Sequence, residues 1–540
     1  MYKVLEERYL EQGVWHALSI VEEIRAAAEK FGERTAIVSG TERVSYTRLV
    51  ELAEGYAAGF LKLGIRPGDR VVVQLPNRLS LIVTMLGLMR FGAVPIMALP
   101  ASRQADIVAL CRLGEPAAYI TTDRYGSNDY APIVRELSAG HGYLRHFITD
   151  NGAVPGTVDL RSLYVEGGKA EAPFPSFRDT GLLLLSGGTT GTPKLIPRRH
   201  ADYMYNARAA AERAGLDAGS SYLVVLPAAH NFSLSAPGIF GTLLNGGKVV
   251  LAASAGVDEA FELIEKEKVT YTALVPALLN LWLEAREWEE ADLSSLRFIQ
   301  AGGAAVDPGM AARVLPELGC KLMNVFGTAE GLISMTAPDD SEDIICTTQG
   351  TPISALDEVR MVGFDGIDVP RGEVGEMIVR GPYTIQGYYR AEEANKTAVT
   401  EDGFYRTGDL ARFTDEGRIV VCGRIKEQIN RAGEKIAPVE VEVVLREMPG
   451  VQDAAVVGVA DEGLGERTCA WISTEDGAEV TMADVYAFFA EKGMARHKYP
   501  DQLELVDAWP LTSVGKIDKI RLAGMAKERT ERSAASSQTV

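Results

Sequence analysis

A loop rich in glycine and hydroxyl side chains follows an apolar run at residues 181–185. The loop reads Ser186, Gly187, Gly188, Thr189, Thr190, Gly191, Thr192, Pro193 and Lys194. Glycines let backbone N–H groups approach an anion, threonines add hydroxyl donors, and the lysine adds a mobile positive charge. The segment therefore predicts a strand that runs into a phosphate-binding loop, with a flexible turn as the alternative. It is not of the Walker type, because no Gly-Lys-Ser/Thr follows at the required spacing and Pro193 stands where a helix would begin.

Further motifs follow this loop along the chain. They are Phe-Gly-Thr-Ala-Glu-Gly at 326–331, Tyr-Arg-Thr-Gly-Asp-Leu at 405–410, Gly-Arg-Ile-Lys at 423–426 with Gly-Glu-Lys-Ile at 433–436, and Gly-Lys-Ile-Asp-Lys at 515–519. Together they resemble the motifs of the adenylate-forming superfamily, which contains acyl- and aryl-CoA synthetases, luciferases and the adenylation domains of nonribosomal peptide synthetases. The resemblance covers nearly the whole chain, from about Ile20 to about Leu522.

The resemblance implies a reaction that joins a carboxylate to AMP, with ATP and Mg²⁺ as cofactors. A carboxylate is a poor electrophile, and the adenylate gives it a phosphate leaving group. The reaction needs a phosphate cradle, a divalent metal, a cation at the reacting oxygens and an anchor for the sugar. By resemblance, the loop from Ser186 to Lys194 holds the β and γ phosphates. Glu330 would ligate Mg²⁺, and Asp409 would accept hydrogen bonds from both ribose hydroxyls.

Other motif positions imply further contacts with the nucleotide. Lys516 matches the catalytic lysine, whose ammonium would bridge the attacking carboxylate and the α-phosphate in the transition state. Arg424 would reach the ribose, and Lys426 corresponds to the hinge about which the small domain rotates for the second half-reaction; each lysine could instead be an ordinary surface charge. Many relatives carry Tyr-Gly-x-Thr-Glu, whereas this chain has Ala329, which offers no hydroxyl to the α-phosphate. The other residues expected to bind ATP are Gly302, Gly303, Ala304, Asn324, Val325, Phe326 and Gly327.

The segment at residues 227–238 predicts which acid is activated. Amino-acid-activating relatives place an aspartate near here to pair with the α-ammonium group. This chain has Asn231, whose neutral amide can bond an ortho hydroxyl or a ring nitrogen. The pair His230 and Asn231, followed by an aromatic residue, resembles the stand-alone aryl-acid ligases of siderophore and antibiotic pathways. His230 would lie beside the carboxylate, or else pack in a strand end. The apolar slot expected for the ring, which would otherwise be core, consists of Phe232, Ala236, Ala301 and Ile333, together with Gly302 and Gly327.

We therefore predict an ATP-dependent enzyme that adenylates an aryl acid such as salicylate, 2,3-dihydroxybenzoate or a related 2-substituted acid. It would then pass the aryl group to the phosphopantetheine thiol of a separate aryl or peptidyl carrier protein, because no carrier-domain serine motif is present. In relatives that accept 2,3-dihydroxybenzoate, the position of Ala236 resembles a serine, so Ala236 favours salicylate. The alternatives are an aryl-CoA ligase that uses free coenzyme A and a catalytically silent protein that binds an acyl adenylate. Retention of Lys516, Glu330 and Asp409 argues against the silent protein.

Short β-branched runs alternate with longer amphipathic stretches, which predicts an α/β protein. At 540 residues the chain is too long for one ordinary core. We expect a large N-terminal domain at residues 1–422, made of doubly wound sheets with a small β-rich subdomain that begins near Glu373. A small, mobile α+β C-terminal domain is expected at residues 423–540.

The composition argues against several other classes of protein. A formal net charge of -19 is unfavourable for binding nucleic acid or an anionic membrane surface. No apolar run approaches the ~20 residues that span a bilayer, and the first residues do not open a secretory signal, so a cytoplasmic protein is expected. Neither a zinc cluster nor a disulfide framework is predicted, because no CxxC pair occurs among the scattered cysteines Cys111, Cys320, Cys346, Cys422 and Cys469.

Overall fold

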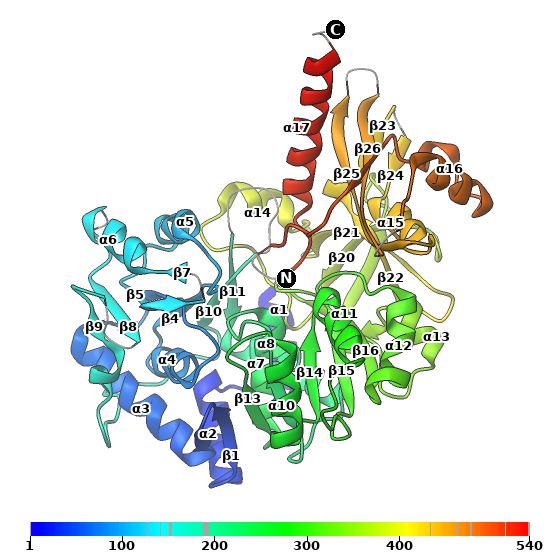
Figure 1. Ribbon diagram of the computed structural model, residues 1–540. Helices are drawn as coiled ribbons and strands as arrows, with labels where there is room; N and C mark the ends of the chain where they lie inside the picture. Colours follow the sequence, from blue (N-terminus) through cyan, green and yellow to red (C-terminus); the bar gives the residue numbers. More distant parts are fainter. Residues whose placement is uncertain are drawn as a thin grey trace. The chain divides into compact units, whose positions relative to one another are not determined.

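The computed structural model describes residues 2–126, 128–140, 142–150, 154–186, 194–432, 434–461, 464–475, 478–512 and 515–537 (Figure 1). The chain divides into two compact units. The first unit comprises Met1–Val359 and Val379–Arg406, and the second comprises Arg360–Ile378 and Thr407–Val540. The domain boundary predicted between residues 422 and 423 stays a prediction.

One sheet of the first unit is parallel in its centre and antiparallel at both edges. Strands in its centre, such as β14, are buried along their whole length, as expected for parallel strands that are covered on both faces. In sheet order the strands are β18 (Thr351–Pro352), β17 (Leu332–Met335), β16 (Lys321–Thr328), β15 (Phe298–Gly302), β14 (Tyr271–Leu274), β12 (Ser221–Val224), β13 (Lys248–Leu251), β1 (Thr35–Ser39) and β2 (Glu42–Ser45).

Helices cover both faces of this sheet. On one face, Phe261 of α10 (Val257–Glu267) and Trp282 of α11 (Pro276–Ala285) pack with Ile299 of β15 in one apolar cluster. On the other face, the hydroxyl of Thr242 in α9 (Gly238–Leu244) lies 2.6 Å from the hydroxyl of Tyr271 in β14. This arrangement confirms the predicted doubly wound fold.

A further sheet of the first unit carries the strand that precedes the phosphate loop. Its order is β11 (Leu195–Arg199), β10 (Thr180–Leu185), β4 (Val94–Met97), β3 (Arg70–Val73), β5 (Ala118–Thr122), β8 (His146–Asp150) and β9 (Val158–Asp159). The pairs are parallel except for β10 with β11. The apolar run at residues 181–185 therefore forms a strand, as predicted.

The remaining elements of the first unit connect and cover these sheets. The short strands β6 (Arg124–Tyr125) and β7 (Asn128–Asp129) pair with each other. The other helices are α1 (Tyr2–Glu11), α2 (Ile20–Phe31), α3 (Tyr46–Leu63), α4 (Leu79–Arg90), α5 (Gln104–Gly114), α6 (Ala131–Gly140), a 3-10 turn at Leu160–Leu163, α7 (His200–Arg213), α8 (Asn231–Ser235), α12 (Pro308–Leu318), α13 (Glu342–Thr347) and α14 (Glu392–Ala398).

A small sheet occupies the region where the sequence predicted a β-rich segment, and its strands β21 and β22 are antiparallel. Its order is β19 (Glu358–Val362), β20 (Gly375–Arg380), β21 (Tyr405–Phe413) and β22 (Ile419–Arg424). The register of β21 and β22 places Asp409 opposite Arg424. Two motifs that are separate in the sequence therefore meet across one strand pair.

The second unit contains an α+β module built on a strand pair with two apolar faces. Along β25 (Val451–Asp461), Ala454 and Val456 face one core, whereas Ala455 and Val457 face another. The first core is closed by α15 (Pro438–Arg446) and α16 (Met482–Glu491), and the second by α17 (Lys519–Ser537). The other elements are 3-10 turns at Ile425–Glu427 and Arg496–Lys498, β23 (Ile429–Arg431), β24 (Glu434–Ile436), β26 (Gly465–Thr474) and β27 (Gln502–Leu505).

Within the described part of the chain, no helix combines the length and the apolar character needed to cross a bilayer.

Candidate active site

The two ends of the predicted phosphate loop are joined to each other. The backbone N–H of Ser186 donates to the carbonyl oxygen of Lys194 at 3.0 Å, and the N–H of Lys194 donates to the Ser186 hydroxyl at 3.2 Å. Leu185 and Leu195 pair just inside these bonds in the β10–β11 register. Gly187, Gly188, Thr189, Thr190 and Gly191 lie outside the described residues, so the phosphate-binding role of the loop stays a prediction.

Glu330 is a buried carboxylate that accepts a hydrogen bond from a tyrosine. The hydroxyl of Tyr388 donates to Glu330 Oε1 at 2.9 Å and lies 2.9 Å from the hydroxyl of Tyr405. The ammonium of Lys194 lies 4.5 Å from the centre of the Tyr388 ring. Within the described residues Glu330 makes no ion pair. A buried acid without a cation partner fits the predicted Mg²⁺ ligand, because Mg²⁺ is commonly held by one or two carboxylates together with substrate phosphates.

The residues predicted to surround adenine lie on two neighbouring parallel strands. The register pairs Ala301 of β15 with Asn324 of β16, and Gly302 with Val325. A Cβ atom at Gly302 would lie 2.4 Å from the carbonyl oxygen of Val325, so only glycine permits this approach. The Asn324 Nδ2 donates to the Ile345 carbonyl at 3.3 Å. The Asn324 Oδ1 is then the side-chain atom that would accept a hydrogen bond from the adenine amino group. Phe326 and Gly327 continue β16, and Gly303 and Ala304 directly follow β15.

Asp409 has one engaged oxygen and one orphaned oxygen. Arg424 Nε donates to Oδ1 at 2.8 Å, whereas Oδ2 is buried and has no hydrogen-bond partner within the described residues. Burial raises the pKa of Asp409, and the charge of Arg424 opposes that shift. A buried acceptor without a donor is costly. The orphaned Oδ2 therefore fits the predicted role of Asp409 in accepting hydrogen bonds from ribose hydroxyls.

Lys516 lies at the end of a tight turn in the same unit as Asp409 and Arg424. Leu511 and Ile517 form a bridge at the base of this turn, and the Lys516 N–H donates to the Thr512 hydroxyl at 3.2 Å. Burial lowers the pKa of Lys516, and the positive charge of Arg424 lowers it further, whereas Asp409 and Glu427 raise it.

Two nearby lysines differ in their partners. Lys519 Nζ lies 2.7 Å from Glu442 Oε1 in an ion pair. Lys516 has no ion pair within the described residues, which leaves its ammonium available for a ligand. Lys426 lies exposed in the 3-10 turn at Ile425–Glu427, and its hinge role stays a prediction.

The predicted acid-binding segment forms the short helix α8. His230 caps this helix, because its Nδ1 accepts the N–H of Phe232 at 3.2 Å. A ring nitrogen that accepts a hydrogen bond carries no proton, so Nε2 is the imidazole nitrogen that bears one. Asn231 begins the helix, and its Oδ1 accepts a hydrogen bond from the hydroxyl of Tyr203 at 2.9 Å.

The residues predicted to form the ring slot are buried in the first unit. Phe232 and Ala236 lie on and just after α8, with 8% and 3% of their surface exposed. Ala301 lies in β15, and Ile333 lies in β17, where the register pairs it with Gly327. Burial alone is also expected for core residues, so their contact with an aryl ring stays a prediction.

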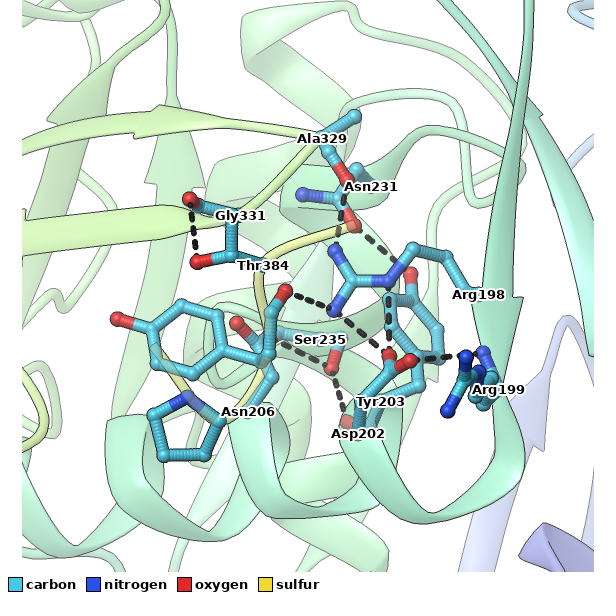
Figure 2. Close-up of polar contacts among 12 residues, drawn as sticks. Arg198, Arg199, Asp202, Tyr203, Asn206, Asn231, Ser235, Ala329, Gly331 and Thr384 are labelled. Carbon is cyan, nitrogen blue, oxygen red and sulfur yellow. Dashed lines mark hydrogen bonds and ion pairs between the residues drawn. The ribbon is translucent and has the colours of Figure 1, made fainter. Parts of the chain in front are cut away.

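The structure also contains a buried polar network that the sequence did not predict (Figure 2). Arg198 is only 1% exposed. Its Nε donates to Asp202 Oδ1 at 3.0 Å, its Nη1 donates to the Ala329 carbonyl at 2.7 Å, and its Nη2 donates to the Tyr383 carbonyl at 3.0 Å. The guanidinium carbon also lies 5.0 Å from the centre of the Tyr203 ring. The network thus connects the start of α7 to the loop that precedes Glu330.

A sequence signal for this network did exist. Arg198 and Asp202 are four residues apart, at the junction between a strand and a helix, which is the spacing of an ion pair on a helix. An arginine inside the run Leu195–Arg199 is unusual for a buried strand unless it has a partner. The backbone partners Ala329 and Tyr383 follow Arg198 by 131 and 185 residues, so no local pattern could have identified them.

A second buried acid supports the strand that carries Ile333. The hydroxyl of Tyr383 donates to Asp357 Oδ2 at 2.5 Å and accepts the N–H of Ile333 at 3.2 Å. Burial raises the pKa of Asp357 to about 7, although the hydrogen bond from Tyr383 lowers it in part.

We expect the stability of the first unit to fall as the pH rises from about 4 to about 7 because of Asp357. An unfolded aspartate ionises near pH 3.9, so in this window the folded state retains a proton that the unfolded state has released. The contribution is fully present below the window and lost above it, at most about 1.4 kcal/mol per pH unit. Asp357→Asn should remove this dependence, so the variant should gain stability relative to wild type between pH 5 and pH 8 in denaturation experiments. A constant difference across this range would contradict the prediction.

Comparison with known families assigns most of the chain. A family model described as AMP-binding enzyme matches residues 24–389. A second model, described as AMP-binding enzyme C-terminal domain, matches residues 440–516.

Individual relatives are similar over nearly their whole length. The chain is 46% identical to the 2,3-dihydroxybenzoate-AMP ligase of Bacillus subtilis, with 97% of each chain covered. It is 42% identical to the salicyl-AMP ligase / salicyl-S-ArCP synthetase of Mycobacterium tuberculosis, covering 96% of this chain and 93% of that protein. Among solved structures, the apo structure of Mycobacterium smegmatis MbtA matches with a TM-score of 0.75 at 40% identity, covering 96% of each chain.

Proposed function

Because the chain belongs to the family of AMP-binding enzymes, we propose that it activates an aryl carboxylic acid with ATP. An oxygen of the carboxylate forms a bond to the α-phosphorus, the bond from that phosphorus to pyrophosphate breaks, and an aryl adenylate results. The aryl group then passes to the phosphopantetheine thiol of a separate carrier protein, and AMP leaves.

The observation that carries this proposal is the polar pair at the start of α8. Asn231 has a neutral amide, which cannot balance the α-ammonium group of an amino acid as a carboxylate would. By the resemblance, His230 would lie beside the substrate carboxylate, and its Nε2–H is a donor of the kind that a carboxylate accepts. The relatives named for 2,3-dihydroxybenzoate and salicyl substrates act on acids with an ortho hydroxyl, which an amide can bond.

The other side chains supply the charge and the anchors for adenylation. The ammonium of Lys516 would neutralise charge that develops between the carboxylate and the α-phosphate. Asp409 Oδ2 would accept from the ribose, and Arg424 would support Asp409 from Oδ1. Glu330 would hold Mg²⁺, which when bound stabilises negative charge on phosphate oxygens.

A pyrophosphate-exchange panel tests the acid class. We expect salicylate, 2,3-dihydroxybenzoate or picolinate to drive ATP–pyrophosphate exchange, and leucine and phenylalanine to give only background exchange. Benzoate, anthranilate and quinaldate in the same panel report on the ortho group and on the size of the slot. Exchange with leucine or phenylalanine above that with salicylate would overturn the proposal.

The identity of the thiol is tested separately. Purified enzyme with ATP and the best acid is offered a phosphopantetheinylated aryl carrier protein or free coenzyme A, and the thioester is quantified. We expect faster transfer to the carrier. Faster transfer to coenzyme A would instead make the protein an aryl-CoA ligase.

Ala236 is expected to disfavour 2,3-dihydroxybenzoate. Its methyl group offers no hydrogen bond to a 3-hydroxyl, and the neighbouring Ser235 hydroxyl is already engaged: it donates to the Tyr203 carbonyl at 3.1 Å and accepts from Asn206 Nδ2 at 2.9 Å. An unpaired buried hydroxyl costs about 1 to 3 kcal/mol. Ala236→Ser should therefore shift the ratio of kcat/KM values from salicylate toward 2,3-dihydroxybenzoate by about tenfold, which corresponds to ~1.4 kcal/mol. Benzoate is the control acid. An unchanged ratio would show that Ala236 does not contact the substituted edge of the aryl ring.

A further inference from the structure

The amide of Asn231 is oriented by a side chain from a different helix. The hydroxyl of Tyr203, in α7, donates to Asn231 Oδ1 at 2.9 Å. Figure 2 shows the amide nitrogen of Asn231 on the side that faces away from Tyr203. With its oxygen occupied by the Tyr203 hydroxyl, the groups that the amide can offer to a ligand are its N–H donors.

Tyr203 is well suited to act only as a donor in this bond. Its side chain is fully buried, and burial raises its pKa far above the ordinary value, so the phenol stays protonated at neutral pH. The guanidinium of Arg198 lies over its ring, and the rings of Tyr203 and Phe240 form a T-shaped pair with centroids 5.9 Å apart. The ring therefore has little freedom to turn its hydroxyl away from Asn231.

The orientation of the Asn231 amide decides whether it can bond an ortho substituent that accepts hydrogen bonds or one that donates them. In salicylate the hydroxyl donates to the neighbouring carboxylate and its oxygen accepts a further bond. A ring nitrogen, as in picolinate, is likewise an acceptor. In anthranilate the nitrogen lone pair is delocalised into the ring, so the amino group acts mainly as a donor.

We propose that Tyr203 is a positioning residue that holds the Asn231 amide with its N–H groups toward the acid and so selects aryl acids that carry an ortho hydrogen-bond acceptor. The inference rests on the proposed function, in which Asn231 contacts the ortho group. Tyr203 touches no reacting atom and acts through Asn231.

The test compares three acids in wild type and Tyr203→Phe. The phenylalanine keeps the ring but removes the donor, so the amide can turn and present its oxygen. We expect the ratio of kcat/KM for salicylate over anthranilate to fall about tenfold, while kcat/KM for benzoate, which has no ortho group, stays within twofold. Tyr205→Phe is the matched control, because it removes a hydroxyl 2.7 Å from Ser354 on the same helix without touching Asn231. It should leave all three values unchanged.

A double-mutant cycle shows whether Tyr203 acts through the amide. In an Asn231→Ala background, Tyr203→Phe should no longer change the salicylate to anthranilate ratio. If Tyr203 had a purely structural role, Tyr203→Phe would lower kcat/KM equally for all three acids, and that result would overturn the inference. An unchanged salicylate to anthranilate ratio in Tyr203→Phe would also overturn it. So would the same change of this ratio in the wild-type and Asn231→Ala backgrounds. Failure of the proposed function is distinguishable, because wild type itself would then activate none of the aryl acids.

Discussion

Lys516→Ala should slow aryl-adenylate formation by about 10²- to 10³-fold, because a charge contact made in the transition state of a preorganised site contributes roughly 3 to 4 kcal/mol. The Lys516 ammonium has no ion pair within the described residues, although Asp409 and Glu427 act on its pKa. Transfer from preformed aryl adenylate to the carrier thiol should be nearly unaffected, because the predicted rotation of the small domain about Lys426 would withdraw Lys516 before the second half-reaction. The measurements are pyrophosphate exchange for the first step and thioester formation from synthetic adenylate for the second.

A surface lysine of the same unit serves as the control for this experiment. Lys492 forms an ion pair with Glu447 that is exposed on both sides, and Lys492→Ala should leave both steps within twofold of wild type. Equal losses in the two steps for Lys516→Ala would reject its assignment to adenylation.

Arg198→Met should destabilise the first unit by about 3 to 5 kcal/mol, because it leaves the buried carboxylate of Asp202 without its counter-charge. The carbonyl oxygens of Ala329 and Tyr383 would also lose their donor. Adding Asp202→Asn to Arg198→Met should recover much of the loss, since an amide is neutral and its oxygen can still accept from the N–H of Arg199. The free energy of unfolding, measured by denaturant titration, checks both variants.

The control for this prediction is Arg313→Met, which removes an ion pair with the same sequence spacing at a more exposed position. Arg313 and Glu317 are also four residues apart, here both within α12, and their side chains are 44% and 34% exposed, so this substitution should cost less than about 1 kcal/mol. If Arg198→Met cost no more than Arg313→Met, or if the double variant were no more stable than the single one, the buried pair would not hold the loop as described.

Local patterns were sufficient to predict the class of fold and several of its strands. The apolar run at residues 181–185 became β10, because strands of a largely parallel sheet are buried on both faces and need continuous apolar side chains. In β25 the alternating residues 454–457 are apolar on both faces, since helices cover both sides of that sheet. In both strands the need for apolar side chains on both faces involves only neighbouring residues of one strand, so it can be seen in the local sequence.

The site could be predicted only where a motif resembled a known family. Asn231 and Asp409 were found in this way, but the hydroxyl that orients Asn231 and the oxygen of Asp409 that lacks a donor were not. Tyr203 precedes Asn231 by 28 residues and belongs to another helix. Its role depends on how α7 and α8 pack, which no periodicity in the sequence encodes.

The close approach of β15 and β16 limits how the acid specificity of this enzyme can be redesigned. Any side chain at Gly302 would push the two strands apart, so a library that varies this position should yield misfolded protein and no new substrates. Ala236 and Ile333 have side chains of their own; Ala236 directly follows α8, and Ile333 lies in the short strand β17. Directed evolution toward larger or differently substituted acids should therefore accumulate changes at Ala236 and Ile333 and leave Gly302 invariant.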